Sequence, residues 1–427
     1  MLSVPNLRLS KNFWPLEKNH SSLYDEGVLW TPFTIMKTKK FITLPILLLL
    51  TFIMYLLIHD IIGGTLLSSS PYNSYTLQAL AWRSGRLDLG HDYPWLELAI
   101  YGGKYYVSFP PVPTLFMLPL TFLFGESTPD NLVILFYALA MLTAAYFILR
   151  KIGANEIISA FWSVFFVLGS NMLWMCTDGS VWFLAQALNF VLCSFAILCA
   201  VYKKKVLSLI LLALAVGCRP FSVFLFPPLL LFFYEQDREL LPDLSRKKQI
   251  WCILKPLLAP AAIAFLYMLF NYLRFHNPFE FGHSYLPEFN RGESQFSVAN
   301  IGKNFLNILR PVTLSGSLRP EFPIYDGFLF FVANPFFILF FTRIRKMKPY
   351  QICTLICMGL NLIGLLMHRT FGGWQFGARY TVDLLPYALF FCMYTLKERP
   401  KPWEIFLGSF AVLFNLYGAF AMHFLYQ

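Results

Sequence analysis

Charged residues are scarce in this sequence of 427 residues, since Asp, Glu, Lys and Arg together make up only 13%. An ordinary soluble domain carries roughly 25% charged and 45–50% apolar residues, whereas hydrophobic residues here reach 57%. A soluble globular protein and a disordered chain are therefore excluded. The apolar runs are long enough to form membrane-spanning helices, so the composition predicts an all-α integral membrane protein.

Motifs that bind nucleotides, metals or nucleic acids are absent as well. None of the eight cysteines stands in a CxxC motif, and the sequence contains neither a GxGxxG motif nor a P-loop. No soluble segment combines clustered Arg and Lys with interleaved aromatic residues, which argues against a nucleic-acid partner. The net charge of +11 is therefore interpreted as a signal of membrane topology.

Eleven apolar runs predict eleven transmembrane helices, since such runs can cross a hydrocarbon core of about 30 Å. The runs are Phe41–Ile62, Asn131–Leu149, Ile157–Met175, Val181–Val201, Val206–Gly217, Phe221–Tyr234, Cys252–Tyr272, Gly327–Thr342, Ile352–Met367, Val382–Leu396 and Ile405–Leu425. A further run, Val112–Phe124, is short and is interrupted by Pro113 and Pro119. We expect it to be a re-entrant or interfacial helix rather than a twelfth span.

The basic residues then set the expected orientation. With Val112–Phe124 left out of the count, the positive clusters fall on the side of the N-terminus: Arg150-Lys151, Lys203–Lys205, Arg246–Lys248, Arg343–Lys348 and Lys397–Lys401. Because positive loops stay in the cytoplasm, the N-terminus is predicted to be cytoplasmic. Two long loops, residues 63–130 and 273–326, are then extracytoplasmic, and most of the polar chemistry of the chain gathers on that face.

Residues 1–35 differ from the remainder because they contain no apolar core, which excludes a signal peptide. We expect them to be a disordered N-terminal extension upstream of a translation start at Met36, where the sequence begins as bacterial membrane proteins normally do. The alternative is a short disordered cytoplasmic tail. Residues 36–427 are predicted to form a single transmembrane domain.

The first long loop contains three acids within ten residues, Asp88, Asp92 and Glu97. Glu97 stands among apolar residues, and partial burial raises the pKa of a carboxyl group, as a general base requires. A solvated loop would hold acids at no cost, which is the alternative for all three. Earlier in the loop, Asn73–Ser84 has the spacing of an amphipathic helix at a membrane surface.

Short motifs in a fixed order resemble a known class of enzymes. They are Gly85–Leu89 (GRLDL), Glu97–Tyr106 (ELAIYGGKYY), Phe109–Pro113 (FPPVP), Asn271–Gly282 (NYLRFHNPFEFG) and Gly372–Tyr380 (GGWQFGARY). The pattern is similar to the GT-C class of membrane glycosyltransferases, which includes the protein mannosyltransferases and the aminoarabinose transferases of lipid A. The resemblance spans residues 41–400 and implies a GT-C-like fold.

The resemblance also implies a function, which is the transfer of a sugar from a polyprenyl-phosphate-linked donor to an extracytoplasmic glycan, lipid or protein. In this class a first-loop carboxylate acts as the base, and the anomeric configuration is generally inverted. Many members carry an acid pair just after the first span, where Ser68–Asn73 has no acid here. The base is therefore assigned to Glu97, then Asp92, then Asp88. No cofactor is expected, and a divalent metal is compatible with the chemistry but not required.

Three cations are the candidates for binding the donor phosphate: Lys104, Arg219 and Arg379. A phosphate at headgroup depth is best bound by a cation, although each of these side chains could instead pair with lipid phosphate. Five residues on the same face are the candidates for contacting the substrates: Tyr101, Tyr105, Trp374, His368 and Asp178. For Asp178, the chemistry of an Asp-Gly turn is an alternative explanation.

Other functions stay open from the sequence. A transporter or lipid flippase usually shows internal repeats and charges near the bilayer midplane, and neither feature is evident. A polymerase or ligase of surface polysaccharide shares the many spans but not the first-loop motif, and a non-catalytic scaffold is a further alternative. The preferred hypothesis is a bacterial plasma-membrane enzyme with its active site outside the cytoplasm and its second long loop folded over the first.

Overall fold

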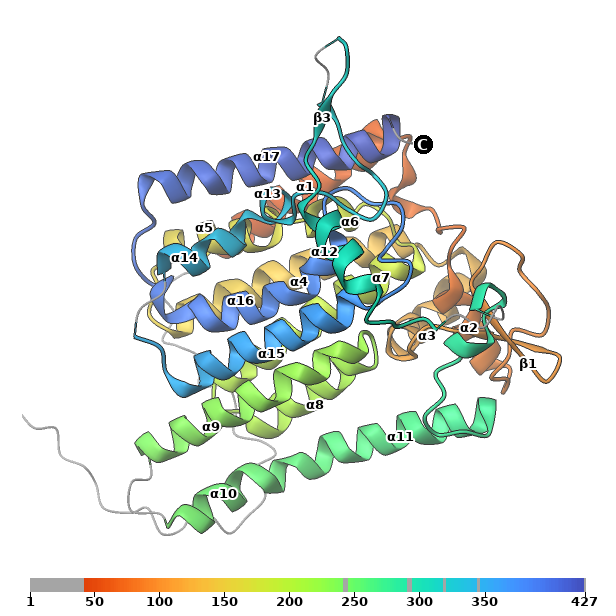
Figure 1. The fold of residues 1–427 in the computed structure, drawn as a ribbon, viewed down its shortest axis with the longest axis horizontal. Helices are drawn as coiled ribbons and strands as arrows, with labels where there is room; N and C mark the ends of the chain where they lie inside the picture. Colours follow the sequence, from red (N-terminus) through yellow and green to blue (C-terminus); the bar gives the residue numbers. More distant parts are fainter. Residues whose placement is uncertain (1–41, 241–244, 290–293, 318–319, 344–345, 426–427) are drawn as a thin grey trace, which may run out of the picture. The chain divides into compact units, whose positions relative to one another are not determined.

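The computed structural model describes residues 42–240, 245–289, 294–317, 320–343 and 346–425. These residues belong to one unit, in which most helices run side by side in a bundle (Figure 1). The extension expected at residues 1–35 lies outside the described residues, as does Phe41, the first residue of the first predicted span.

Within the described ranges, six helical stretches are long and apolar enough to cross a membrane. They are α1 (Thr43–Ile61), α4 (Asp130–Lys151), α7 (Val181–Val201), the stretch Arg246–Phe275 made of α10 (Arg246–Leu254), η4 (Lys255–Leu257) and α11 (Leu258–Phe275), α15 (Pro349–Leu366) and α17 (Pro402–Phe424). Large apolar side chains such as Leu258 and Phe265 are exposed on this bundle, as expected for a surface that faces lipid. The prediction of a multi-pass helical membrane protein is confirmed.

The other predicted spans form helices that are shorter or interrupted. They are α5 (Glu156–Val167) with α6 (Met172–Met175), α8 (Lys205–Val216), η3 (Pro220–Leu225) with α9 (Phe226–Leu240), α13 (Phe330–Ala333) with η7 (Pro335–Ile338) and α14 (Leu339–Arg343), and η8 (Arg379–Leu384) with α16 (Leu385–Cys392) and η9 (Met393–Thr395). Pro220 and Pro335 stand at the first position of η3 and η7. Proline has no N–H to donate to a preceding turn, so a regular helix does not continue through these positions.

Buried asparagines bind the backbone groups that these interruptions leave free. The Asn171 N–H donates to Asn334 Oδ1 at 2.8 Å, and Asn334 Nδ2 donates to Asn171 Oδ1 and to Thr381 Oγ1 at 2.9 and 3.1 Å. Asn415 of α17 donates to the Ala333 carbonyl at 2.9 Å. Because an unpaired polar group in this environment costs several kcal/mol, the network fixes where the broken helices end and where η8 lies.

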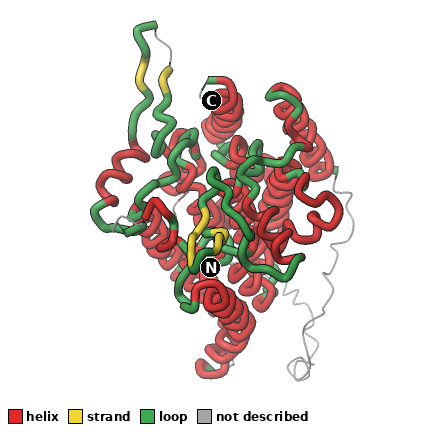
Figure 2. Tube along the Cα trace, turned by 90° about the vertical axis from the view of Figure 1, so that its right-hand side faces the viewer, coloured by secondary structure: helices red, strands yellow, loops and turns green. Residues whose placement is uncertain are grey.

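The helices connect two ends of the bundle that differ in composition. At the end we call the basic end, Lys151 lies over the Tyr202 ring at 4.6 Å, and Lys205 pairs with Asp237. At the opposite end, which we call the loop end, the first long loop covers the bundle on the right of Figure 1, and Figure 2 looks onto this end. The positive clusters and the first long loop therefore lie at opposite ends of the helices.

The first long loop is largely ordered into short elements. They are η1 (Thr65–Leu67), α2 (Ser74–Arg83), β1 (Leu98–Tyr101), β2 (Lys104–Val107), α3 (Val112–Phe124) and η2 (Gly125–Ser127). The helices expected at Asn73–Ser84 and Val112–Phe124 are present as α2 and α3. The antiparallel pair of β1 and β2 corrects the all-α prediction, because four-residue strands are too short to show the alternation that identifies a strand.

The second long loop contains η5 (His283–Tyr285), η6 (Pro287–Phe289), α12 (Asn300–Leu309) and a second antiparallel pair of β3 (Thr313–Leu314) and β4 (Pro320–Glu321). Its Tyr285 ring lies 4.7 Å from the Tyr101 ring of the first loop, centroid to centroid. The ring of Phe275, at the end of α11, packs edge-on against Tyr106 of the first loop, with the ring centroids 5.3 Å apart. The second loop therefore packs on the first, as expected.

Candidate active site at the loop end

Glu97 lies at the start of the β1–β2 hairpin, where it faces the bundle. Its Oε1 accepts a hydrogen bond from Trp182 Nε1 of α7 at 3.2 Å, and its carbonyl accepts one from Ser108 Oγ at 2.9 Å. Burial, supported by the nearby charge of Glu288, raises the pKa of the Glu97 carboxyl to about 7, although the Trp182 hydrogen bond and Arg379 act in the opposite direction. A carboxyl group with such a pKa can accept a proton near neutral pH.

The hairpin fixes Glu97 through its buried side chains. Leu98 pairs with Val107 and Ala99 with Tyr106, and all four are buried. Leu98 and Val107 pack in one small apolar cluster, while Ala99 and Tyr106 pack in another together with Phe275. Because the two faces of the hairpin are both covered, a shift of the strand register would expose apolar side chains, and Glu97 is held where it meets α7.

Arg379 opens η8 and is 5% exposed. Its Nε and Nη2 donate to the Gly372 carbonyl at 3.2 and 2.9 Å, and its Nη1 donates to Gln186 Oε1 at 3.0 Å. A Cβ atom at position 372 would lie 3.1 Å from Arg379 Nε, which is closer than an ordinary contact. The backbone φ of Gly372, +92°, also favours glycine. All acceptors of Arg379 in the described residues are thus neutral oxygens. Burial lowers the pKa of Arg379 because removal from water penalises its charged form.

Arg219 lies between α8 and η3 and has a carboxylate partner. Its Nε and Nη2 both lie 2.8 Å from Asp383 Oδ2. Burial acts to lower the pKa of Arg219, but the charge of Asp383 and the contact with Tyr380 outweigh it, so the pKa is raised. The Tyr380 ring contacts both cations, with its centroid 4.9 Å from the Arg219 guanidinium carbon and 5.1 Å from that of Arg379. We call these two residues the arginine pair.

Two histidines lie close enough to the arginine pair to respond to its charge. Burial is the largest cause that lowers the pKa of His368 to about 3, and Arg219, His283 and Arg379 add to it. Burial also lowers the pKa of His283 to about 4. Both imidazoles are therefore neutral at physiological pH. The structure thus brings together Glu97, Arg219, Arg379 and His368, four of the residues singled out in the sequence.

The other first-loop candidates lie in or close to the hairpin, on both of its faces. Lys104 is 60% exposed in its side chain, and its Nζ lies 3.7 Å from Asp88 Oδ2 in an ion pair. Asp92 is exposed to solvent. Tyr101 packs on Phe275 and Tyr285, while Tyr105 is partly buried against the first-loop cluster. The contacts described for these five candidates therefore join none of them to Arg219 or Arg379.

Two further candidates have local partners. Asp178 Oδ1 accepts hydrogen bonds from the Ser180 N–H and hydroxyl at 2.8 and 2.6 Å, which is the geometry of a turn. Trp374 is partly buried, and its backbone forms an antiparallel bridge with Tyr325 of the second loop. Trp374 therefore lies where the second loop meets the segment that leads to Arg379.

Sequence reasoning missed two residues that connect the arginine pair, Gln186 and Asp383. Gln186 Nε2 donates to Asp383 Oδ1 at 3.2 Å, and both side chains are buried. A signal was present, because both residues lie inside predicted spans, Val181–Val201 and Val382–Leu396. Polar and charged residues inside a membrane span usually have a functional or pairing role.

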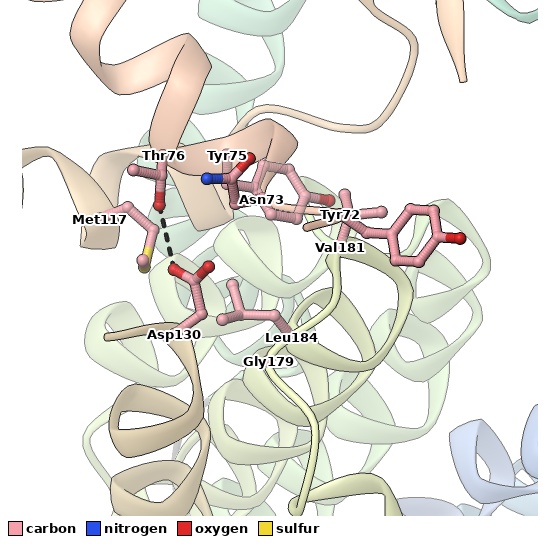
Figure 3. Close-up of a pocket in the computed structure, with 9 residues that line it drawn as sticks. All are labelled: Tyr72, Asn73, Tyr75, Thr76, Met117, Asp130, Gly179, Val181 and Leu184. Carbon is pink, nitrogen blue, oxygen red and sulfur yellow. Dashed lines mark hydrogen bonds between the residues drawn. The ribbon is translucent and has the colours of Figure 1, made fainter. Parts of the chain in front are cut away.

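A third residue missed by sequence reasoning, Asp130, lines a small cleft beside the site (Figure 3). The cleft is lined by Tyr72, Asn73, Tyr75, Thr76, Met117, Asp130, Gly179, Val181 and Leu184. Asp130 accepts hydrogen bonds from Thr76 Oγ1 at 3.0 Å and from the Ser70 N–H at 3.3 Å. It thereby attaches the start of α4 to the stretch Ser68–Asn73, where the sequence has no acid of its own.

In the described residues, no three His, Cys, Asp or Glu side chains are arranged so that they could hold a metal ion. The chemistry available at the loop end is instead a carboxyl group of raised pKa within reach of the charge of the buried Arg379, with the partly buried Arg219 next to Arg379. Such a combination can accept a proton and bind an anionic group at the same place.

Comparison with known proteins gives a likeness of fold. No protein family model and no curated protein matches the chain. The crystal structure of ArnT from Cupriavidus metallidurans bound to undecaprenyl phosphate matches with a TM-score of 0.51 and 13% sequence identity, over 84% of this chain and 61% of that chain. The apo structure of the same protein matches with a TM-score of 0.48 and 13% identity, over 82% and 60%.

The chain thus spans about three fifths of the length of the ArnT chain that it matches. A likeness at 13% identity concerns the path of the chain, so it bears on the fold. The described residues of this protein have an ArnT-like fold, in agreement with the resemblance of the motifs to the aminoarabinose transferases.

Proposed function

We propose that this protein is a membrane glycosyltransferase of the GT-C type, which moves a sugar from a polyprenyl-phosphate-linked donor to an extracytoplasmic acceptor. The ArnT-like fold supports the class, and the solved ArnT structure is bound to undecaprenyl phosphate. The single observation that carries the proposal is the position of Glu97, whose carboxyl pKa is raised to about 7 beside Arg379. A base and an anion-binding cation at one site are the two groups that the reaction requires.

Glu97 acts as the general base in this proposal. It accepts the proton of the acceptor hydroxyl while the hydroxyl oxygen forms a bond to the anomeric carbon. The bond from that carbon to the phosphate oxygen breaks, and the polyprenyl phosphate leaves with the bonding electrons. Attack from the side opposite to the leaving phosphate inverts the anomeric configuration. The Trp182 N–H, at 3.2 Å, orients the carboxylate.

Arg379 binds the donor phosphate in this proposal, with Arg219 beside it. A buried cation is costly unless an anion compensates it, and the described hydrogen bonds of Arg379 use only neutral acceptors. The phosphate supplies the missing charge. Arg219 already pairs with Asp383. It therefore adds positive charge near the phosphate, while Arg379 makes the main contact. Lys104 and Asp88, which form their own ion pair, lie at the rim.

The proposed orientation places the loop end outside the cytoplasm of a bacterial plasma membrane, with eleven crossings between the two ends. The distribution of basic residues supports it, because positive clusters mark the cytoplasmic side. Ser294 and Ser245 are both exposed, in the second long loop and beside the Arg246–Lys248 cluster. Ser294→Cys should react with a membrane-impermeant thiol reagent in intact cells, and Ser245→Cys should react only after lysis. The reverse pattern would overturn the orientation, and the unsubstituted protein serves as background control.

The proposal is tested by Glu97→Gln, which keeps the shape of the side chain and removes its charge. A positioned base contributes roughly 10²–10⁴-fold to rate, so transfer from the donor should be lost on that scale. Binding of undecaprenyl phosphate to the purified protein should persist. Glu126→Gln, at an exposed position of the same loop, is the matched control. Full activity of Glu97→Gln would show that Glu97 is not the base.

A further inference from the structure

We infer that Gln186 is a positioning residue that holds the arginine pair ready for a phosphate group. This inference rests on the proposed function, in which Arg379 binds the phosphate of a lipid-linked donor. Gln186 lies in the first turns of α7 and has no exposed surface. It acts through the two cations and is not itself assigned a contact with the substrate.

Both ends of the Gln186 amide are engaged at the site. Its Oε1 accepts a hydrogen bond from Arg379 Nη1 at 3.0 Å. Its Nε2 donates to Asp383 Oδ1 at 3.2 Å and to the Arg379 carbonyl at 3.3 Å. Asp383 in turn binds Arg219 through its other oxygen, Oδ2. One amide therefore completes a chain of contacts that joins the two guanidinium groups.

The amide suits this position because it offers an acceptor to a cation and a donor to a carboxylate. A carboxylate at position 186 would compensate Arg379 but would repel Asp383 and compete with a phosphate. An apolar side chain would leave one N–H of Arg379 and one oxygen of Asp383 without this partner. Glutamine orients Arg379 without neutralising it, so the cation keeps its charge for a ligand.

The Tyr380 ring contacts both members of the arginine pair. Its centroid lies 4.9 and 5.1 Å from the two guanidinium carbons, and the residue is 7% exposed. Cations held in place before binding do not lose side-chain freedom when the anion arrives. The consequence is a phosphate site whose affinity depends on Gln186 although Gln186 does not touch the phosphate.

The test compares Gln186→Met with Gln78→Met in the purified full-length protein. Methionine has nearly the same length as glutamine but cannot form these hydrogen bonds. Gln78 in α2 is equally buried, and it accepts a hydrogen bond from Thr114 Oγ1 and none from Arg219 or Arg379 in the described residues. Undecaprenyl phosphate in detergent micelles is the probe, and its dissociation constant and the thermal unfolding of each variant are measured.

We expect Gln186→Met to weaken undecaprenyl phosphate binding about tenfold, because charged hydrogen-bond partners lose their geometry. We expect Gln78→Met to bind within about twofold of wild type, because the hydrogen bond it loses is to Thr114 and not to the arginine pair. Gln186→Asn retains a buried amide that is one methylene shorter, and it should weaken binding similarly. With a sugar donor, the loss should fall on KM for the donor more than on kcat.

The outcomes separate this inference from the proposed function. If the unsubstituted protein does not bind undecaprenyl phosphate, the proposed donor class is wrong. If it binds, if Arg379→Met weakens binding and if folded Gln186→Met or Gln186→Asn binds as wild type does, the positioning role of Gln186 is refuted. Equal losses of affinity in the Gln186 and Gln78 variants would also refute it, because the effect would then be structural.

Discussion

Buried arginines lie at both ends of the bundle, Arg343 at the basic end and Arg274 and Arg379 at the loop end. The comparison of Arg343 with Arg379 contrasts a cation compensated by a carboxylate of the protein with one that has only neutral acceptors in the part of the chain that the structure describes. At the basic end, Arg343 is 6% exposed and binds both carboxylate oxygens of Glu404, which has no exposed surface. Its Nη1 donates to the Thr395 carbonyl at 2.7 Å. Arg343 is therefore compensated by a carboxylate within the protein and joins α14 to α17.

At the loop end, Arg379 is buried to the same degree but has only neutral acceptors among the described residues. Its hydrogen bonds fix its direction without cancelling its charge. Burial of a charge is tolerated when a partner anion is present, and at this end the partner in our proposal is the donor phosphate. The two arginines are equally buried and differ in their hydrogen-bond partners, which are a carboxylate for Arg343 and neutral oxygens for Arg379.

The largest expected effect is on stability, at Glu404. Glu404→Gln leaves Arg343 buried without its anion, which typically costs about 3–5 kcal/mol. We expect this substitution to cause a larger loss of stability than any other single replacement proposed for the two arginine sites, seen as a lower unfolding temperature of the purified protein in detergent. Binding of undecaprenyl phosphate by the fraction that remains folded should not change.

A double replacement tests whether the unpaired buried charge causes this loss of stability. Arg343→Met combined with Glu404→Met removes both charges at once, so no uncompensated ion is left buried. The double variant should recover most of the stability that Glu404→Gln loses. A double variant no more stable than Glu404→Gln would contradict the view that pairing of charge is what Arg343 and Glu404 contribute.

Arg379→Met should have the next largest effect, on binding rather than on stability. A hydrogen-bonded charge contributes roughly 1.5–3 kcal/mol, which corresponds to about a tenfold or greater loss of affinity for undecaprenyl phosphate. The unfolding temperature should change little or rise, since the variant removes a buried cation without a carboxylate partner. Wild-type affinity in Arg379→Met would show that Arg379 does not bind the phosphate, and the two arginines would then not differ in function.

The smallest effect concerns the pH dependence of transfer. Glu97 acts as a base only when it is deprotonated, so activity should rise with pH through about 7, the pKa of its carboxyl group. Arg379 holds that pKa down. Arg379→Met should therefore move the rising limb of the pH profile to higher pH in the residual activity. The Arg343→Met, Glu404→Met double variant serves as control, and its profile should coincide with that of the wild type.

Sequence motifs point to four residues that the structure brings together in the candidate site, but not to the contacts that connect them. Glu97 was identified from its apolar neighbours, and Arg219 and Arg379 from their position at the ends of apolar runs. Lys104 and Asp88 carry the same kinds of charge, yet the structure pairs them with each other at the rim. No spacing in the sequence distinguishes these groups, because the difference arises from which helices pack behind each of them.

The interruptions of the helices were also beyond sequence reasoning. The run Ile157–Met175 is continuous in hydropathy, but the helix breaks between Val167 and Met172. Asn171 there binds Asn334, which is 163 residues away. Hydrophobic periodicity records the environment of a segment and contains no information about a distant partner that stabilises a break.

The sequence by itself determined the class of this protein. Low charge and long apolar runs require a helical membrane protein, because a backbone in lipid must satisfy its own hydrogen bonds. The tertiary structure decided which charges are compensated. Glu404 reaches Arg343 across 61 residues, while Gln186 reaches Arg379 across 193. Whether a buried cation meets an anion or a neutral amide depends on the packing of helices far apart in sequence, since the electrostatic energy of a charge is set by the groups around it.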